Sequence, residues 1–147
     1  MLAGTATTSR AQIPDTHIGE GVPRDVRELY DRGLKYLVSS QDDNGGWSEG
    51  QSGAGQTGLC VMAFLASGED PNFGVYSVNV RKGIESIIRE QDPNTGFFGH
   101  SMYHHGFAML ALAEAYGTVD DRNFSTGDAQ RSRSIGAALE LAVRAAI

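Results

Sequence analysis

The sequence predicts an all-α protein built from helical hairpin repeats, about two and a half of them. Apolar residues recur at helical spacing in five segments, which alternate between amphipathic ones and ones that are apolar on every side. The segment 32–47 also has a looser copy at 82–98, with Gln41 and Gln91 in matching places. Repeated helix pairs stack on their neighbours, so we expect amphipathic helices in an outer layer and apolar helices in an inner one.

The first outer helix is expected to begin near Pro23, a residue suited to a first helical turn. Before it, residues 1–21 are small and polar and read as a flexible tail. The repeats then fill 22–147. We expect the other helices at about 54–67, 78–90, 102–116 and from 128 to the end of the chain, with Ser101 as the N-cap of the helix at 102–116. The second and fourth of the five are uncharged along their middles, which is typical of buried helices. The last begins a third repeat that stops short at Ile147.

The composition narrows the class of protein. The chain has 147 residues, which suits one domain, and a formal net charge of −6, whereas nucleic-acid-binding surfaces are normally basic. We see neither a run of about 18 apolar residues nor a basic start followed by an apolar stretch. We therefore expect no nucleic-acid partner, no membrane-spanning segment, no signal peptide and, by default, a cytoplasmic location. Cys60 is the only cysteine, so an internal disulfide is excluded.

The end of the first helix and the turn after it carry a motif. Residues 32–47 read Arg-Gly-x-x-Tyr-Leu-x-x-x-Gln-x-x-x-Gly-x-Trp, in which the last three defined residues are Gln41, Gly45 and Trp47. At every defined position this resembles the QW motif of squalene and oxidosqualene cyclases. Residues 82–98 resemble a degenerate copy of it, with the corresponding residues Gln91, Gly96 and Phe98. The segment 103–117 resembles the inner helix of bacterial prenyltransferase and squalene oxidase repeat proteins.

This resemblance covers about 22–147 and implies part of an α/α toroid of the terpenoid cyclase and protein prenyltransferase type. A full toroid has more helix pairs, so the expected partners are the remaining repeats of a longer chain, or self-association. The implied ligand is apolar or isoprenoid. We expect the amide of Gln41 to donate to the unpaired carbonyls at the end of its own helix, with the indole of Trp47 packed over it, so that the motif staples repeats together.

The chain departs from the catalytic patterns of these families. The Asp-x-Asp-Asp acid of class II terpene cyclases is missing. Protein prenyltransferases hold zinc with an Asp, a Cys two residues later and a distant His after a Tyr. Here Cys60 and His104 are candidate zinc ligands, but Gly58 replaces the Asp and leaves the site incomplete. We therefore predict no cofactor.

Polar residues near the start of each inner helix are the best candidates for a binding site. Aligning Gly58 with Gly106 places Gln56 opposite His104 and Thr57 opposite His105. With Tyr103, these four side chains are predicted to line the mouth of a cavity, because pockets in helical folds form where helix ends converge. The alternative is that they bond only to neighbouring loops.

Two hypotheses for function remain open. In the first, the chain is a non-catalytic binding or structural module of a larger protein. In the second, it is part of a cyclase-like or prenyltransferase-like enzyme that acts on an isoprenoid, with its catalytic residues elsewhere. Sequence alone leaves undecided whether any reaction is catalysed.

Overall fold

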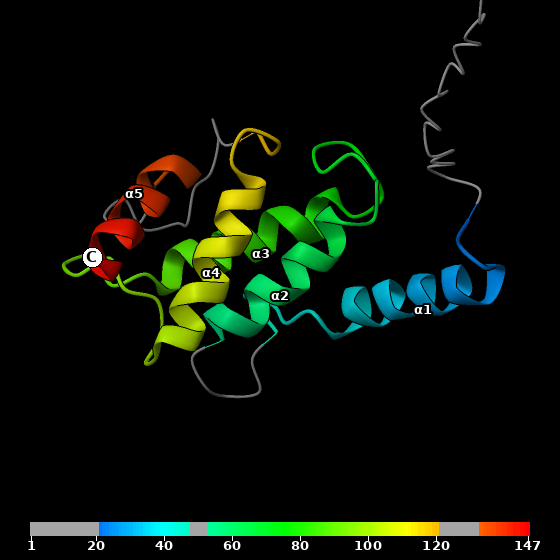
Figure 1. Cartoon of the computed structure of the whole chain (residues 1–147), viewed down its shortest axis with the longest axis horizontal. Coiled ribbons are helices and arrows are strands. Elements are labelled where there is room, and N and C mark those ends of the chain that lie inside the picture. The colour runs from blue at the N-terminus through cyan, green and yellow to red at the C-terminus, as the bar shows by residue number, and fades with distance from the viewer. Residues whose placement is uncertain (1–20, 48–52, 121–132) are drawn as a thin grey trace, which may run out of the picture.

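The computed structural model describes residues 21–47, 53–120 and 133–147, and the regular elements in those ranges are helices (Figure 1). They are α1 (Arg24–Ser40), α2 (Ala54–Leu65), α3 (Ser77–Glu90), α4 (Met102–Ala115) and α5 (Ile135–Ala146). One isolated antiparallel bridge joins Gln91 to Phe98. The all-α prediction is confirmed. No helix in the described part of the chain is both long and apolar enough to cross a bilayer. The predicted tail lies outside the described residues, apart from residue 21.

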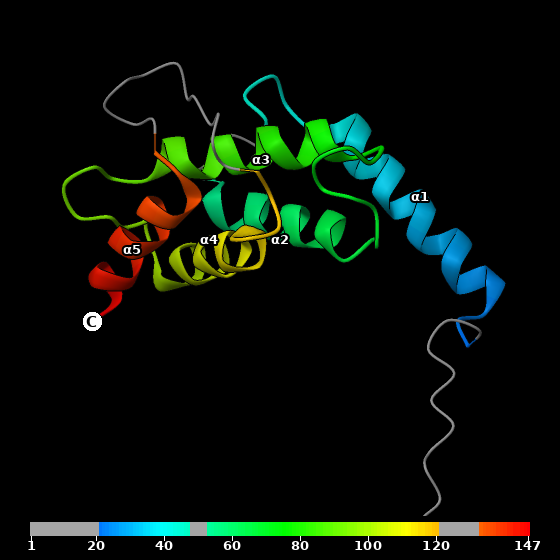
Figure 2. The ribbon, with the colours of Figure 1, turned by 90° about the horizontal axis from the view of Figure 1, so that it is seen from above.

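The helices form an inner pair and an outer set (Figure 2). The inner helices α2 and α4 lie side by side and share the most extensive contact. The outer helix α3 packs on α2, and α5 packs on α4. Each of these outer helices therefore lies against the inner helix that precedes it in the chain. The first helix, α1, touches α2 only slightly and projects from the body of the molecule (Figure 1).

Glycines in α2 allow the two inner helices to approach closely. A Cβ at Gly58 would lie 2.6 Å from the carbonyl oxygen of Phe107, and one at Gly55 would lie 2.9 Å from the Cα of His104. Such distances are too short for any side chain, so glycine is required at both places. The buried apolar residues of α4 fill the rest of the contact. They are Ala108, Ala111, Leu112 and Ala115.

The outer helix α3 supplies much of the remaining core. Its four apolar residues at helical spacing, Val80, Ile84, Ile87 and Ile88, are each at most 1% exposed. Burying side chains of this size contributes about 1.5–3 kcal/mol each. This helix therefore contributes a large part of the core through its contact with α2.

The prediction that the inner helices are buried on every side is wrong for the described structure. Leu59 of α2 is 38% exposed and Leu110 of α4 is 46% exposed. An apolar surface on all sides of a helix shows that it avoids water, but it does not say which neighbour covers each side. Among the described residues, nothing covers this side of α2 and α4.

One helix limit differs from expectation. The last helix begins at Ile135, where the hydroxyl of Ser134 accepts a hydrogen bond from the backbone N–H of Ala137 at 3.2 Å. The predicted start at 128 lies outside the described residues. The predicted cap of α4 is confirmed, because the hydroxyl of Ser101 accepts from the N–H of His104.

Candidate functional site

Gln41 joins the first turn to the next outer helix. Its side-chain Nε2 donates to the carbonyl of Gly45 at 2.9 Å and to the carbonyl of Asn79 at 3.0 Å. Its Oε1 accepts from the side-chain amide of Asn79 at 2.7 Å. Asn79 lies in the first turn of α3. The prediction that Gln41 donates to the end of its own helix is therefore wrong, and its partner is the start of the following outer helix.

Trp47, rather than Gln41, bonds a carbonyl at the end of α1. Its indole Nε1 donates to the carbonyl of Leu37 at 2.8 Å, in the last turn of α1. Helix ends leave such carbonyls without an intrahelical partner. The indole ring also lies 5.9 Å from the ring of Phe64 in α2, centroid to centroid. Trp47 thus ties the end of α1 to the core.

Gln91 repeats the arrangement of Gln41 in the second turn. It is 1% exposed, and its Nε2 donates to the carbonyls of Gly96 at 2.9 Å and Ala138 at 2.8 Å. Ala138 lies in the first turn of α5. The Oε1 of Gln91 accepts from the guanidinium of Arg133 at 2.8 Å. Both glutamines therefore hold the turn that follows one outer helix against the beginning of the next.

The glycines of the two turns are required by this close approach. Gly45 and Gly96 have φ angles of 83° and 77°, which L side chains rarely adopt. A Cβ at Gly45 would also lie 2.4 Å from the carbonyl oxygen of Lys82, and one at Gly96 would lie 2.5 Å from that of Leu141. The backbone of each turn rests directly on the next outer helix.

Two of the residues predicted to line a cavity mouth are instead buried and bonded. His105 is fully buried, where its Nδ1 accepts from the N–H of Phe98 at 3.1 Å. Its Nε2 then carries the proton and donates to the carbonyl of Ala142 at 3.0 Å. Thr57 is also fully buried, and its hydroxyl accepts from the N–H of Trp47 at 3.3 Å. At aligned positions, each residue bonds the backbone of the motif's aromatic residue.

The other three candidates lie near the surface. Gln56 is exposed, Tyr103 is 55% exposed, and His104 is half-buried. The rings of Tyr103 and His104 meet edge to face, 5.6 Å apart. Only His104 of this group has a buried polar atom without a hydrogen-bond partner in the described structure, its Nδ1.

Glu90 accompanies His104, and sequence reasoning missed it. Its Oε2 is likewise buried without a partner in the described part of the chain. Burial raises the pKa of the Glu90 carboxyl, although hydrogen bonds from the N–H groups of Ala54 and Gly53 and the nearby His104 oppose that rise. The start of α2 therefore faces an acid and an imidazole. The only sequence signal was a carboxylate directly before Gln91.

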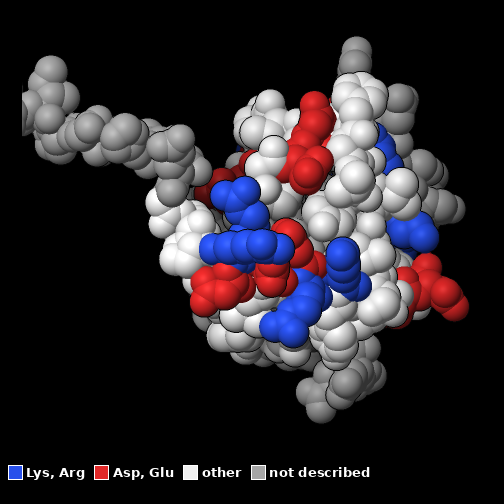
Figure 3. All heavy atoms as spheres, turned by 90° about the vertical axis from the view of Figure 1, so that its right-hand side faces the viewer, with Lys and Arg blue, Asp and Glu red and all other residues white. Residues whose placement is uncertain are grey.

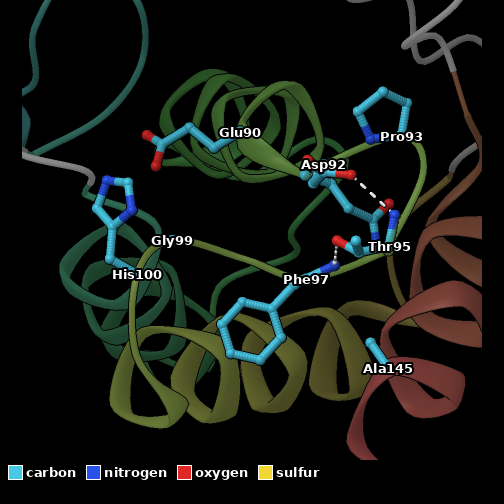
Figure 4. Close-up of a pocket in the computed structure, with 9 residues that line it drawn as sticks. Glu90, Asp92, Pro93, Thr95, Phe97, Gly99, His100 and Ala145 are labelled. Atoms are coloured by element: carbon cyan, nitrogen blue, oxygen red, sulfur yellow. Dashed lines mark hydrogen bonds between the residues drawn. The ribbon is translucent and has the colours of Figure 1, made fainter.

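An open cavity of about 910 Å³ adjoins this place along the second turn (Figure 4). Glu90 and His100 stand at one end of it, Pro93 and Thr95 stand at the other, and Phe97 lies between them. His100 precedes α4 and is exposed, so it does not share a helical face with His104. The cavity is a surface depression beside the turn.

The candidate zinc ligands do not gather into a site. Cys60 is half-buried, and burial raises the pKa of its thiol. Within the ranges that the structure describes, no group of three or more His, Cys, Asp or Glu residues could hold a metal ion. The described geometry therefore offers packing contacts and one acid–imidazole pair.

Comparisons of the chain with protein-family models, with curated proteins and with solved structures found no match.

Proposed function

We propose that the chain is a non-catalytic helical repeat module of the squalene cyclase and prenyltransferase type, which serves as a binding or structural part of a larger protein. One observation carries this proposal: the two glutamines of the motif make hydrogen bonds that join neighbouring parts of the fold. Gln41 and Gln91 both bond to the first turn of the next outer helix. Side chains saturated in this way are suited to holding repeats together.

The arrangement into part of an α/α toroid belongs to the same proposal. It is supported by the recurrence of one contact, a glutamine turn seated on the next outer helix, at α3 and again at α5. Repetition of a fixed contact between neighbouring units generates a curved array. The uncovered side of α2 and α4 would face the inside of that array.

The test is to compare chemistry with assembly in the purified chain. We expect no product when the chain is incubated with squalene or a polyprenyl diphosphate in the presence of Mg²⁺ or Zn²⁺, as followed by gas chromatography and mass spectrometry. We expect Gln41→Ala to loosen the contact between the first turn and α3, seen as faster amide exchange in α3. Turnover by the chain alone would refute the proposal.

The exposed apolar side of the inner helices favours a second candidate, part of an enzyme that acts on an isoprenoid. Leu110 lines a cavity of about 410 Å³ together with Met62 and Leu65 of α2. Such a surface suits the apolar hydrocarbon of an isoprenoid ligand. If this candidate holds, farnesol should bind, Leu110→Glu should abolish binding, and Val143→Glu on α5, 41% exposed, should not. Equal affinities in both variants would exclude it.

A further inference from the structure

The first helix leaves uncovered the face that its counterpart buries. The motif aligns α1 with α3, so that Tyr30 corresponds to Val80 and Val38 to Ile88. Tyr30 is 40% and Val38 is 39% exposed, whereas Val80 and Ile88 are at most 1% exposed. An amphipathic helix gains its stability from packing its apolar face. Leu34 is buried and the hydroxyl of Tyr30 donates to the carbonyl of Ala63 in α2 at 2.7 Å, but the other large apolar residues in the first half of α1 are exposed in the described structure.

Gly33 gives a second and independent sign that something packs on α1. It corresponds to Gly83 of α3, where a Cβ would lie 2.6 Å from the side chain of Val61 and 3.3 Å from the indole of Trp47. Gly83 is therefore required by a neighbouring helix and turn. A Cβ at Gly33 would meet nothing within 4 Å. Glycine in the middle of a helix destabilises it, so an open site is a poor reason to have one.

The covering group is visible on the other two outer helices. α3 packs on α2 and receives Gln41, while α5 packs on α4 and receives Gln91. In each case the covering group is a glutamine turn followed by an inner helix. The position on α1 that corresponds to the carbonyl acceptors Asn79 and Ala138 is Leu29, which is 61% exposed. The described residues place no turn or inner helix there.

We propose that α1 is the acceptor surface for a further helical hairpin of this same construction, a Gln-x-x-x-Gly-x-Trp turn followed by an apolar helix. The surface consists of Val26, Leu29 and Gly33, next to Tyr30, whose hydroxyl already bonds the carbonyl of Ala63 in α2. Both turns of this type in the described structure are already bonded within the chain, at Asn79 and Ala138, so a second copy has no free turn to offer. The occupant is a partner hairpin. This inference rests on the proposed function as a repeat module.

The charges on this side of the molecule fit a protein partner. Figure 3 views the molecule from the α1 side and shows basic and acidic side chains interspersed with uncharged surface. A ligand of a single charge sign would call for a patch of the opposite sign. Mixed charges beside an apolar stripe are usual where proteins meet.

The experiment supplies the hairpin from the chain itself. A copy of residues 22–71 is inserted before Val22, which places Gln41 of the copy 38 residues ahead of Leu29, the spacing that separates Gln41 from Asn79. We expect amide exchange in α1 to slow by about tenfold or more relative to the parent chain. Unchanged exchange in α1 would overturn the proposal. Unchanged exchange would not bear on the turnover assay that tests the proposed function. Turnover in that assay would likewise not change the exchange result, so the two failures can be told apart.

Gly33 provides the matched control because its effect should change sign. In the parent chain Gly33→Leu meets open space and should raise the melting temperature slightly through helix propensity. In the tandem chain, Gly33→Leu in the original α1 should block docking and return the exchange of that helix to the parent rate. Gln41→Ala in the added copy alone should have the same effect. Slow exchange that survives both substitutions would overturn the proposed contact.

Self-association is the competing outcome. A native mass spectrum of the parent chain should show a monomer. A dimer that Gly33→Leu dissociates would overturn the partner hairpin in favour of a second copy on the same face.

Discussion

Replacement of Trp47 by alanine should cost about 2–4 kcal/mol of unfolding free energy. Full truncation of a buried core tryptophan costs about 3–5 kcal/mol. Trp47 is only half-buried, which lowers that figure. It also donates a hydrogen bond to the carbonyl of Leu37, and a bond of this kind contributes about 1 kcal/mol. The ring contact with Phe64 is lost as well.

The measurement is thermal and urea unfolding followed by circular dichroism, because Trp47 is the only tryptophan and its fluorescence disappears with it. At roughly 2–4 °C per kcal/mol for a chain of this size, the melting temperature should fall by about 5–15 °C. Trp47→Phe keeps a ring and loses the indole donor, so its melting temperature should lie between those of the parent and Trp47→Ala. A melting temperature for Trp47→Ala within a degree of the parent would refute the tie between α1 and the core.

Four further substitutions test the polar groups. Gln91→Leu leaves two carbonyls and the guanidinium of Arg133 without their partner and should cost about 2–3 kcal/mol in urea unfolding, more than Gln41→Leu in its half-buried turn. His104→Ala should change stability by less than about 1 kcal/mol, because the buried Nδ1 makes no hydrogen bond in the described structure; a larger loss would mean that the imidazole is bonded. The raised pKa of Glu90 means that the folded state holds its proton more tightly than the unfolded one, whose value is near 4.5. Its contribution is therefore largest at low pH and is lost as the pH rises through the folded-state pKa. Glu90→Gln should remove that fall, so melting curves at pH 4 and pH 8 should differ less than in the parent. An unchanged difference would contradict this cause.

The helices could be predicted because their signals are local. Apolar spacing located α1, α3 and α4 to within one residue at their starts, and Ser101 marked a cap that the structure contains. These signals depend on backbone periodicity and on hydrogen bonds within a few residues. They need no knowledge of the neighbouring helices.

The site residues were harder to predict because their partners are distant in sequence. The carbonyl that accepts from Gln41 lies 38 residues away, and His105 bonds a carbonyl 37 residues away. Side-chain type shows that Thr57 and His105 can form hydrogen bonds, but not that backbone groups will take up both. The pairing of Glu90 with His104 likewise arises only when the end of α3, the start of α2 and the start of α4 meet.

The two turns also indicate what sets the stacking of the hairpins. Gln41 and Gln91 reach acceptors at 38 and 47 residues' distance, yet each bonds the first turn of the next outer helix. The connecting segments therefore differ in length while the contact stays the same. The residue four positions after each acceptor is buried: Gly83 follows Asn79, and Ala142 follows Ala138. The larger of the two, Ala142, receives the turn that carries Phe98 in place of Trp47. At Gly83 a Cβ would lie 2.6 Å from the side chain of Val61 and 3.3 Å from the indole of Trp47, so close packing excludes a methyl group there. The geometry is thus fixed by the turn and the helix face that receives it, and the same face on α1 is the one left open.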